Sequence, residues 1–280
     1  MPELPEVETY VRSLRDGSGE YQVSVVGQVI REGVVLWART LALPSETEFT
    51  QRIKGQAITN LERRGKFLDF SLSKDHLLIH LRMSGDLRLE TAVDENDQSR
   101  EYKLHDRLAL VFTDNTRLVF NDTRKFGRVW LTAVPEEVTG RLGPEPLDRS
   151  LDGEAFFQML TARTRQLKPL LMDQSFLAGL GNIYTDEALH AAKLHPLMNS
   201  RDITPAQAEK LLKAIRGVLN EGILRNGASI DWVYRGGDFQ NHFRVYGRKG
   251  ELCPECGAKI ERLVVGQRGT HICPGCQALK

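Results

Sequence analysis

The sequence has no long apolar run, almost no net charge and only four cysteines. Its apolar stretches, such as residues 77–79, fall far short of the roughly 20 residues that a membrane-spanning helix needs. The opening MPELPEVE is acidic and has no apolar core, unlike a secretion signal. We therefore expect a cytoplasmic protein that does not associate with a membrane.

The formal net charge of +1 by itself disfavours a dedicated nucleic-acid-binding protein. The charge is unevenly distributed, however. Residues 244–280 hold seven basic and three acidic side chains, and residues 52–66 hold five basic side chains and one glutamate. Six carboxylates gather between residues 136 and 154. A nearly neutral chain of this kind can still present a basic face to phosphates.

The length of 280 residues favours two domains. With 41% hydrophobic and 27% charged residues, the chain can build a packed core, which excludes a disordered or collagen-like protein.

The four cysteines form two C-x2-C pairs separated by sixteen residues, Cys253/Cys256 and Cys273/Cys276. This spacing is typical of a tetrahedral zinc site on a ribbon of two short strands, with a turn near Gly266 or Gly269. Two disulfides or a redox pair are the alternatives. Without an export signal disulfides are disfavoured, and a redox motif needs only one pair. Four thiolates fill the coordination shell, so one structural zinc ion is expected.

Hydrophobic periodicity predicts an α+β fold. Residues 5–15 have the spacing of a helix, with Pro5 suited to its first turn. Thr204, Pro205 and Gln207 form a capping box before a second helical pattern. Short strands without intervening helices fill about residues 21–131, which indicates an antiparallel sandwich or barrel. The predicted strands are Phe67–Leu72, Leu77–Met83, Leu108–Phe112, Arg117–Phe120 and Val129–Leu131.

Two loops are weak signals on their own. Ala178–Tyr184 is a glycine-rich turn that opens into a predicted helix at 183–190, and free amides at a helix start attract phosphate. A tight turn between helices is the commoner explanation. Asn121–Gly127 lies between two predicted strands and by itself is a charged hairpin loop.

Six motifs in order resemble bacterial formamidopyrimidine-DNA glycosylase, the 8-oxoguanine repair family. Together they span the whole chain. They are Pro2–Glu8, His80–Gly85, Asn121–Gly127, Gly179–Tyr184, Val245–Gly250 and the cysteine ribbon. The resemblance implies an N-terminal β-sandwich with flanking helices, a helix-two-turns-helix domain and a C-terminal zinc finger. We expect a catalytic domain at 1–133, a linker at 134–150, the helical DNA-binding domain at 151–240 and the zinc finger at 241–280.

The resemblance also implies the catalytic residues. Pro2, exposed after removal of Met1, would be the nucleophile, because an α-amino group titrates around 8. Glu3 would be the general acid/base and Glu6 would support it. Lys66 matches a lysine near the reacting phosphate and sugar. Without the resemblance, Pro2 is an ordinary terminus, Glu3 and Glu6 complement a helix dipole, and Lys66 is a solvated charge.

Further matches imply how duplex DNA with oxidised bases or abasic sites would be bound. Met83, Arg124 and Phe126 match side chains that fill the space left by a flipped base. In the predicted strand Met83 faces the same side as Ile79 and Leu81, so packing in the core is the alternative role for its side chain. Asn182 and Arg268 match phosphate ligands, and Lys168 and His80 match further DNA contacts. Residues 234–243 are expected to cover the flipped base.

The chain departs from the family pattern at Arg82, Thr123, Lys125 and Thr185–Asp186. Arg82 stands where glycine is common. These differences bear on substrate range rather than on activity. The alternatives are the related endonuclease VIII type, specific for oxidised pyrimidines, and a non-catalytic lesion-binding zinc protein. Leu4 and the matches at 83, 124 and 126 favour the purine-specific enzyme. Such an enzyme is expected to be a monomer.

Overall fold

The computed structural model describes residues 1–19, 21, 23–90, 101–229 and 236–279. The described chain forms two compact units. Unit 1 comprises the described residues of Met1–Pro2 and Glu6–Gly140, and unit 2 comprises Glu3–Pro5, Arg141–Ser229 and residues 236–279. The first helix therefore contributes its first residues to unit 2 and the remainder to unit 1.

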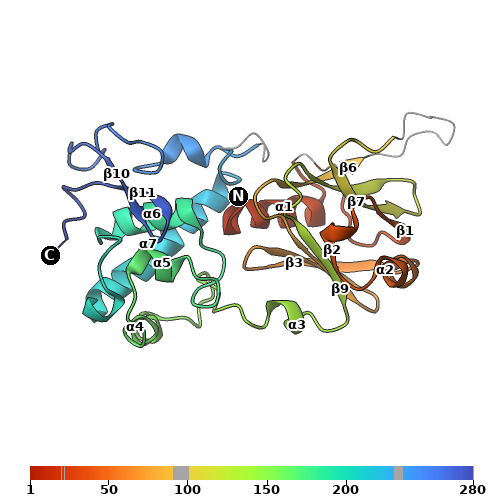
Figure 1. Ribbon diagram of the computed structural model, residues 1–280, viewed down its shortest axis with the longest axis horizontal. Coiled ribbons are helices and arrows are strands. Elements are labelled where there is room, and N and C mark those ends of the chain that lie inside the picture. The colour runs from red at the N-terminus through yellow and green to blue at the C-terminus, as the bar shows by residue number, and fades with distance from the viewer. Residues whose placement is uncertain (20, 22, 91–100, 230–235, 280) are drawn as a thin grey trace. The chain divides into compact units, whose positions relative to one another are not determined.

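Two sheets build unit 1 (Figure 1). The four-stranded sheet has the order β1-β7-β8-β6 and the five-stranded sheet the order β2-β9-β5-β4-β3. Every pairing is antiparallel except β2 with β9, which is parallel. The strands are β1 (Ile30–Val35), β2 (Leu41–Leu43), β3 (Ile58–Arg64), β4 (Phe67–Leu72), β5 (His76–His80), β6 (Gly85–Glu90), β7 (Asp106–Phe112), β8 (Arg117–Asp122) and β9 (Arg128–Thr132).

One hydrophobic core lies within unit 1. Helix α1 (Leu4–Asp16) buries Val7, Val11 and Leu14 in it, at the helical spacing that the sequence predicts. Helix α2 (Glu46–Ile53) adds Phe49 and Ile53. The unit also contains η1 (Ala38–Thr40) and the short helix α3 (Glu136–Thr139).

Unit 2 is helical apart from one hairpin (Figure 1). Thr204 caps α7 through the predicted capping box with Gln207. The hairpin strands β10 and β11 pair in antiparallel register, Val265 opposite Arg268. The elements are α4 (Gly153–Thr161), α5 (Leu167–Leu171), α6 (Asn182–Ala192), η2 (Ser200–Asp202), α7 (Pro205–Leu224), η3 (Phe239–His242), β10 (Glu261–Val265) and β11 (Arg268–Ile272).

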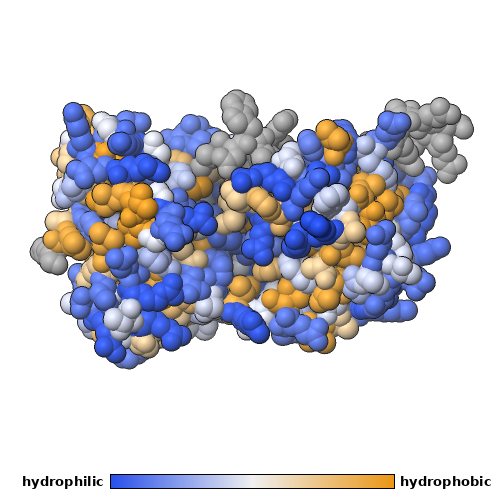
Figure 2. Space-filling model, viewed as in Figure 1, coloured by the Kyte–Doolittle hydropathy of each residue, from blue (hydrophilic) through white to orange (hydrophobic). Residues whose placement is uncertain are grey.

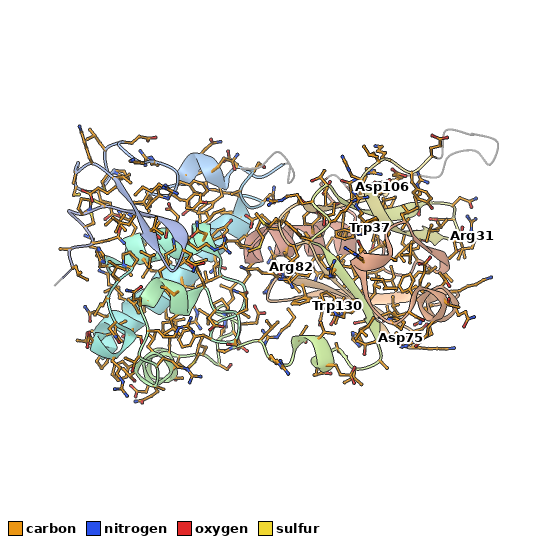
Figure 3. The ribbon with its side chains drawn as sticks, in the orientation of Figure 1. Arg31, Trp37, Asp75, Arg82, Asp106 and Trp130 are labelled. Atoms are coloured by element: carbon orange, nitrogen blue, oxygen red, sulfur yellow. The ribbon has the colours of Figure 1, made fainter. Side chains whose placement is uncertain are left out.

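The sandwich, the helical region and the ribbon are confirmed, but details differ from the sequence-based expectation. The strand predicted at Leu77–Met83 ends at His80, because the chain turns at Arg82, whose φ is 56°. Arg82 is labelled in Figure 3. This left-handed conformation explains why glycine suits the position. The β2–β9 pair is the parallel exception to the expected antiparallel sandwich.

No helix in the described ranges is both long and apolar enough to cross a membrane. Figure 2 shows hydrophilic side chains over much of the viewed face, with hydrophobic residues in scattered groups.

Candidate functional site: a capped helix, two pinned loops and a sulfur cluster

The carboxylate of Glu3 sits on the N-terminus of α6. Its oxygens accept hydrogen bonds from the backbone N–H groups of Gly181 (2.7 Å), Ile183 (2.9 Å) and Tyr184 (3.4 Å). The side chain is only 2% exposed. These amides have no partner within the helix, and the helix dipole favours a negative charge there. The folded chain therefore places this acid at one fixed position.

Two glycines make room for this contact. A Cβ at Gly181 would lie 2.4 Å from Cδ of Glu3, and a Cβ at Gly179 would lie 2.6 Å from a methyl carbon of Leu4. Gly179 also has a φ of +97°. Its carbonyl accepts the Leu4 N–H at 3.0 Å. The glycine-rich turn, for which the sequence suggests phosphate binding or a tight turn, thus receives the N-terminal segment of the chain itself.

Two buried carboxylates that belong to α6 itself bind neighbouring segments through hydrogen bonds. Asp186 accepts a hydrogen bond from Nζ of Lys168 at 2.6 Å and from the N–H of His271 at 2.8 Å. Glu187 accepts three backbone N–H groups from residues 244–246, at 2.8 to 2.9 Å. Burial raises the pKa of Glu187, and the three amides oppose this shift. Helix α6 therefore fixes both the ribbon hairpin and the segment before it.

The side chains of Asn182 and Lys168 converge on one carbonyl of the hairpin. Asn182 Nδ2 donates to the Gly269 oxygen at 3.1 Å, as does Lys168 Nζ at 3.1 Å. Arg268, the next residue back along β11, is exposed. The positive charge of Arg268 also contributes to lowering the pKa of Lys168, after the larger effect of burial. Arg268 is thus an accessible cation on a hairpin that buried polar groups hold in place.

The aromatic residues of the segment at 239–246 pack as a series. Tyr184 stacks on Phe239 with ring centroids 5.2 Å apart, and Phe239 contacts Phe243 edge-on. Phe243 contacts Tyr246, which in turn contacts His271. Of the predicted covering segment, Tyr234 and Arg235 lie outside the described residues. The described part anchors itself through Phe239, which is 2% exposed.

In unit 1, Lys66 and His80 lie close enough to influence one another. Lys66 follows Gly65, whose φ is 57°, in the turn between β3 and β4, and its side chain is buried. His80 stands opposite Phe67 and contacts its ring edge-on at 4.7 Å. Burial, with the positive charges of Arg82 and Lys66, lowers the pKa of His80 to about 3. The neutral ring accepts the Arg82 N–H on Nδ1 at 3.0 Å, so its proton is on Nε2.

The predicted catalytic residues Pro2 and Glu6 also belong to unit 1, and both are buried.

One buried carboxylate, Asp122 at the end of β8, pins two loops of unit 1. Oδ1 accepts the Ser84 hydroxyl and the Arg124 N–H, the latter at 3.1 Å, and Oδ2 accepts the Gly127 N–H at 2.7 Å. The Arg124 N–H also reaches Oγ of Ser84 at 3.1 Å, which ties the loop after β8 to the turn after β5. Asn121, the first residue of the predicted Asn121–Gly127 motif, donates a hydrogen bond from its side-chain amide to Asp106 at 2.8 Å. Asp106 is labelled in Figure 3.

These pinned loops present large side chains to solvent. Met83 is 37% exposed and Phe126 is 49% exposed, and the Arg124 guanidinium lies over the Phe126 ring at 5.1 Å. Met83 is therefore not a core residue, which resolves the alternative left by its strand parity. The structure thus exposes two large apolar side chains on loops that Asp122 joins, with the Arg124 cation over one of them. Their role in filling the space left by a flipped base stays a prediction.

The four cysteines converge at the ends of the ribbon. None of the four is in a disulfide, and the Sγ–Sγ distances are 3.3 Å for Cys256–Cys273 and 3.9 Å for Cys253–Cys276. A disulfide needs about 2.05 Å, whereas two thiolates on one tetrahedral zinc ion lie about 3.8 Å apart. The donor set therefore fits zinc and not two disulfides. His190 of α6 adds a ring nitrogen to this cluster.

Three family models match successive parts of the chain. They are the formamidopyrimidine-DNA glycosylase N-terminal domain at residues 1–129, the H2TH domain of the same glycosylase at 142–233, and a zinc finger found in FPG and IleRS at 250–279. A formamidopyrimidine-DNA glycosylase of Protochlamydia amoebophila is 42% identical over 99% of both chains. The chain belongs to the formamidopyrimidine-DNA glycosylase family.

Solved structures of this family agree with the architecture. One is MutM in complex with DNA that contains carbocyclic 8-oxo-G, and another is the Lactococcus lactis protein in complex with Fapy-dG DNA. Each matches with a TM-score of 0.88 and 35% identity, over 99% of this chain and 100% of the other. A DNA repair glycosylase with a structural zinc finger thus accounts for both the sandwich and the helical unit.

The burial of Lys168 bears on the DNA contact that the family resemblance implies for this residue. The resemblance implies a direct DNA contact, but the side chain is completely buried and bound to Asp186 and Gly269. In the described structure no part of Lys168 is open to a phosphate. These contacts tie Lys168 to the hairpin that carries Arg268, and a direct contact of Lys168 with DNA stays a prediction.

Sequence reasoning missed the residues that hold the site in place. No local spacing marks Ser84, Asp122, Asp186 or Glu187 as a structural acceptor or donor, and the Ser84–Asp122, Asp186–His271 and Glu187–Arg244 contacts each join residues distant in the chain. One signal was available, since an acidic residue next to Asn121 in a hairpin motif is well suited to accept loop amides. The partners of Asp186 and Glu187 follow only from tertiary contacts.

Proposed function

We propose that this chain is a bifunctional DNA glycosylase and abasic-site lyase that removes oxidised purines from duplex DNA. The observation that carries the proposal is the fixed Glu3 carboxylate, directly after the secondary amine that Pro2 exposes once Met1 is removed. An amine of this type is a good nucleophile near neutral pH. A carboxyl group held beside it by three amides supplies an acid and base at the reacting sugar.

The proposed reaction begins at C1′ of the damaged nucleotide. The Pro2 nitrogen bonds to C1′ as the glycosidic bond breaks and the base leaves with its bonding electrons. The Glu3 carboxylate takes the proton that the nitrogen releases and passes it to the ring oxygen as the sugar opens to an iminium. The resulting iminium acidifies the C2′ hydrogen. Loss of that proton expels the 3′ phosphate, and a second elimination expels the 5′ phosphate. We assign Glu6 a supporting role and Lys66 a role near the reacting phosphate and sugar, since burial restricts both side chains.

DNA binding is assigned to both units. Met83 and Phe126 would wedge into the space left by the flipped nucleotide, and Arg124 would hydrogen-bond the orphaned base. Asn182 and Arg268 would bind phosphate. His80 is neutral, so it would donate a hydrogen bond from Nε2 rather than provide a charge. Cys253, Cys256, Cys273 and Cys276 would hold the structural zinc ion.

The proposed domains are the catalytic domain at 1–133, a linker at 134–150, the helical DNA-binding domain at 151–240 and the zinc finger at 241–280. Their support is the change from sandwich to helices after Gly140 and the start of the zinc-finger match at residue 250. Because the substrate is chromosomal DNA, we place the enzyme in the bacterial cytoplasm, on the nucleoid, and we propose that it acts as a monomer.

Borohydride trapping tests the chemistry. With a chain shown by intact mass to begin at Pro2, we expect a covalent adduct with an 8-oxoguanine·cytosine duplex. Pro2→Gly or a retained Met1 should abolish the adduct. A chain that begins at Pro2 and forms no adduct would show that it is a non-catalytic binder. A preference for thymine glycol duplexes would instead assign it to the endonuclease VIII type.

The salt dependence of binding tests the phosphate contact at Arg268. Replacing Arg268 with Ala should weaken binding to all duplexes and reduce the slope of log K against log salt by about 1. Arg262→Ala, also exposed on the ribbon, is the matched comparison. An unchanged slope for Arg268→Ala would remove Arg268 from the DNA contacts.

A further inference from the structure

The sulfur cluster has a fifth donor. The Nε2 atom of His190 lies 3.4 Å from Sγ of Cys253. Nε2 and the sulfurs of Cys253, Cys273 and Cys276 all lie within 4.8 Å of one another. In a tetrahedral zinc site with one nitrogen and three sulfur ligands, nitrogen and sulfur are about 3.5 Å apart. These four atoms are therefore close enough to one another to bind one ion as a second ligand set, which omits Cys256.

The burial of the five side chains indicates which ligand is dispensable. Cys253, Cys273 and His190 are buried and Cys276 is half-buried, whereas Cys256 is exposed. His190 belongs to α6, whose buried Asp186 accepts the His271 N–H of the ribbon hairpin and whose buried Glu187 accepts three N–H groups of residues 244–246. Its ring therefore reaches the cluster from a rigid element and not from a mobile loop.

The His190 ring can act either as a hydrogen-bond donor or as a metal ligand through Nε2. Nδ1 of His190 is buried and has no partner within the described residues. A metal-bound histidine usually has its tautomer fixed by a hydrogen bond at the other nitrogen. Without that bond, Nε2 can donate its hydrogen to the Cys253 sulfur or present its lone pair to a metal ion.

We propose that His190 is a reserve zinc ligand, which completes a site with Cys253, Cys273 and Cys276 when Cys256 is lost. With all four thiolates present, His190 donates a hydrogen bond to Cys253. When Cys256 is absent, His190 Nε2 takes the fourth position, so zinc remains bound. A ring nitrogen and three thiolates form a known structural zinc set.

The test compares zinc content in full-length variants after dialysis against a weak chelator. Cys256→Ala should retain about one equivalent of zinc, whereas Cys273→Ala, which removes a ligand common to both sets, should retain well under half. His190→Phe should retain zinc through the four thiolates and shows that the fold tolerates this change. The double variant His190→Phe/Cys256→Ala should lose zinc as Cys273→Ala does.

Cobalt substitution identifies the ligand directly. In Cys256→Ala, the thiolate-to-cobalt charge-transfer band should fall to the intensity of three thiolates, with d–d bands typical of a tetrahedral site containing one nitrogen. Zinc loss from Cys256→Ala equal to that from Cys273→Ala would overturn the proposal. Zinc retention by the double variant would also overturn it, since water would then complete the site.

Discussion

One set of side chains in each unit is held in place in an opposite way. In unit 2 the carboxylates at and along α6 are buried, and Glu3, Asp186 and Glu187 each bind backbone amides or a buried cation. In unit 1 the side chains of Met83 and Phe126 are exposed, and a buried carboxylate, Asp122, fixes the loops that carry them. The contrast fits the roles proposed for them, because an acid/base must be fixed to within a fraction of an ångström, whereas a side chain that inserts into a base stack needs open access to it.

The largest expected effect comes from disturbing the Glu3 cap. Gly181→Ala places a Cβ within 2.4 Å of the Glu3 carboxyl carbon, so the carboxylate must leave its position. We expect single-turnover excision to fall by about 100-fold or more, since a positioned acid/base contributes roughly that much. Gly217→Ala on α7 is the matched control, because nothing lies within 4 Å of its added methyl. Equal activities of the two variants would show that the cap does not position Glu3.

A smaller effect, on stability, is expected from the buried pair in unit 2. Lys168→Met leaves Asp186 without its counter-ion in the interior, which costs about 3–5 kcal/mol of unfolding free energy. Urea denaturation measures this loss, and Asp186→Asn in the same chain should recover part of it. Lys213→Met breaks the exposed Lys213–Glu209 pair and should cost well under about 1 kcal/mol. Similar losses in the two single variants would contradict a buried role for Lys168.

Loss of Asp122 in unit 1 should lower the free energy of unfolding less than Lys168→Met does, and it should also affect excision from duplex DNA. Asp122→Ala removes the acceptor of the Ser84, Arg124 and Gly127 donors, and we expect about 2–4 kcal/mol of destabilisation. Excision from a lesion duplex should fall, while borohydride trapping on single-stranded abasic DNA, which needs no wedge, should persist. Asp114→Ala, at an exposed turn of the same unit, is the control. Equal loss with both substrates would place Asp122 in the chemistry rather than under the wedge.

The smallest effect is the pH dependence that His80 confers on unit 1. The folded state keeps this ring neutral down to a pKa of about 3, whereas the unfolded chain protonates it below about 6.5. The unfolded state thus binds more protons in this window, so the free energy of unfolding falls as pH falls from about 6.5. His80→Gln should flatten the decrease between pH 7 and 5 in urea titrations. The same substitution at exposed His242 serves as the reference, and an identical pH slope in both variants would refute the role of burial at His80.

Much of the fold could be predicted because it depends on local patterns. The helix at the N-terminus, the capping box of Thr204 and the ribbon around the cysteines follow from spacing alone. The strand after His76 was predicted too long, because no local pattern shows that Arg82 adopts a left-handed conformation. For the same reason Met83 was ambiguous until its exposure was known.

The sequence by itself determined the family, the zinc ligands to expect and the residue types of the reaction, because motif order and cysteine spacing are properties of the chain. Only the tertiary structure decided what those residues touch. It placed the Glu3 carboxylate on the amides of the glycine-rich turn, buried Lys168 against Asp186, and joined Asp122 to Ser84 beneath the exposed Met83 and Phe126 loops. Each of these contacts joins residues at least 18 positions apart, where neither periodicity nor a local motif carries the information.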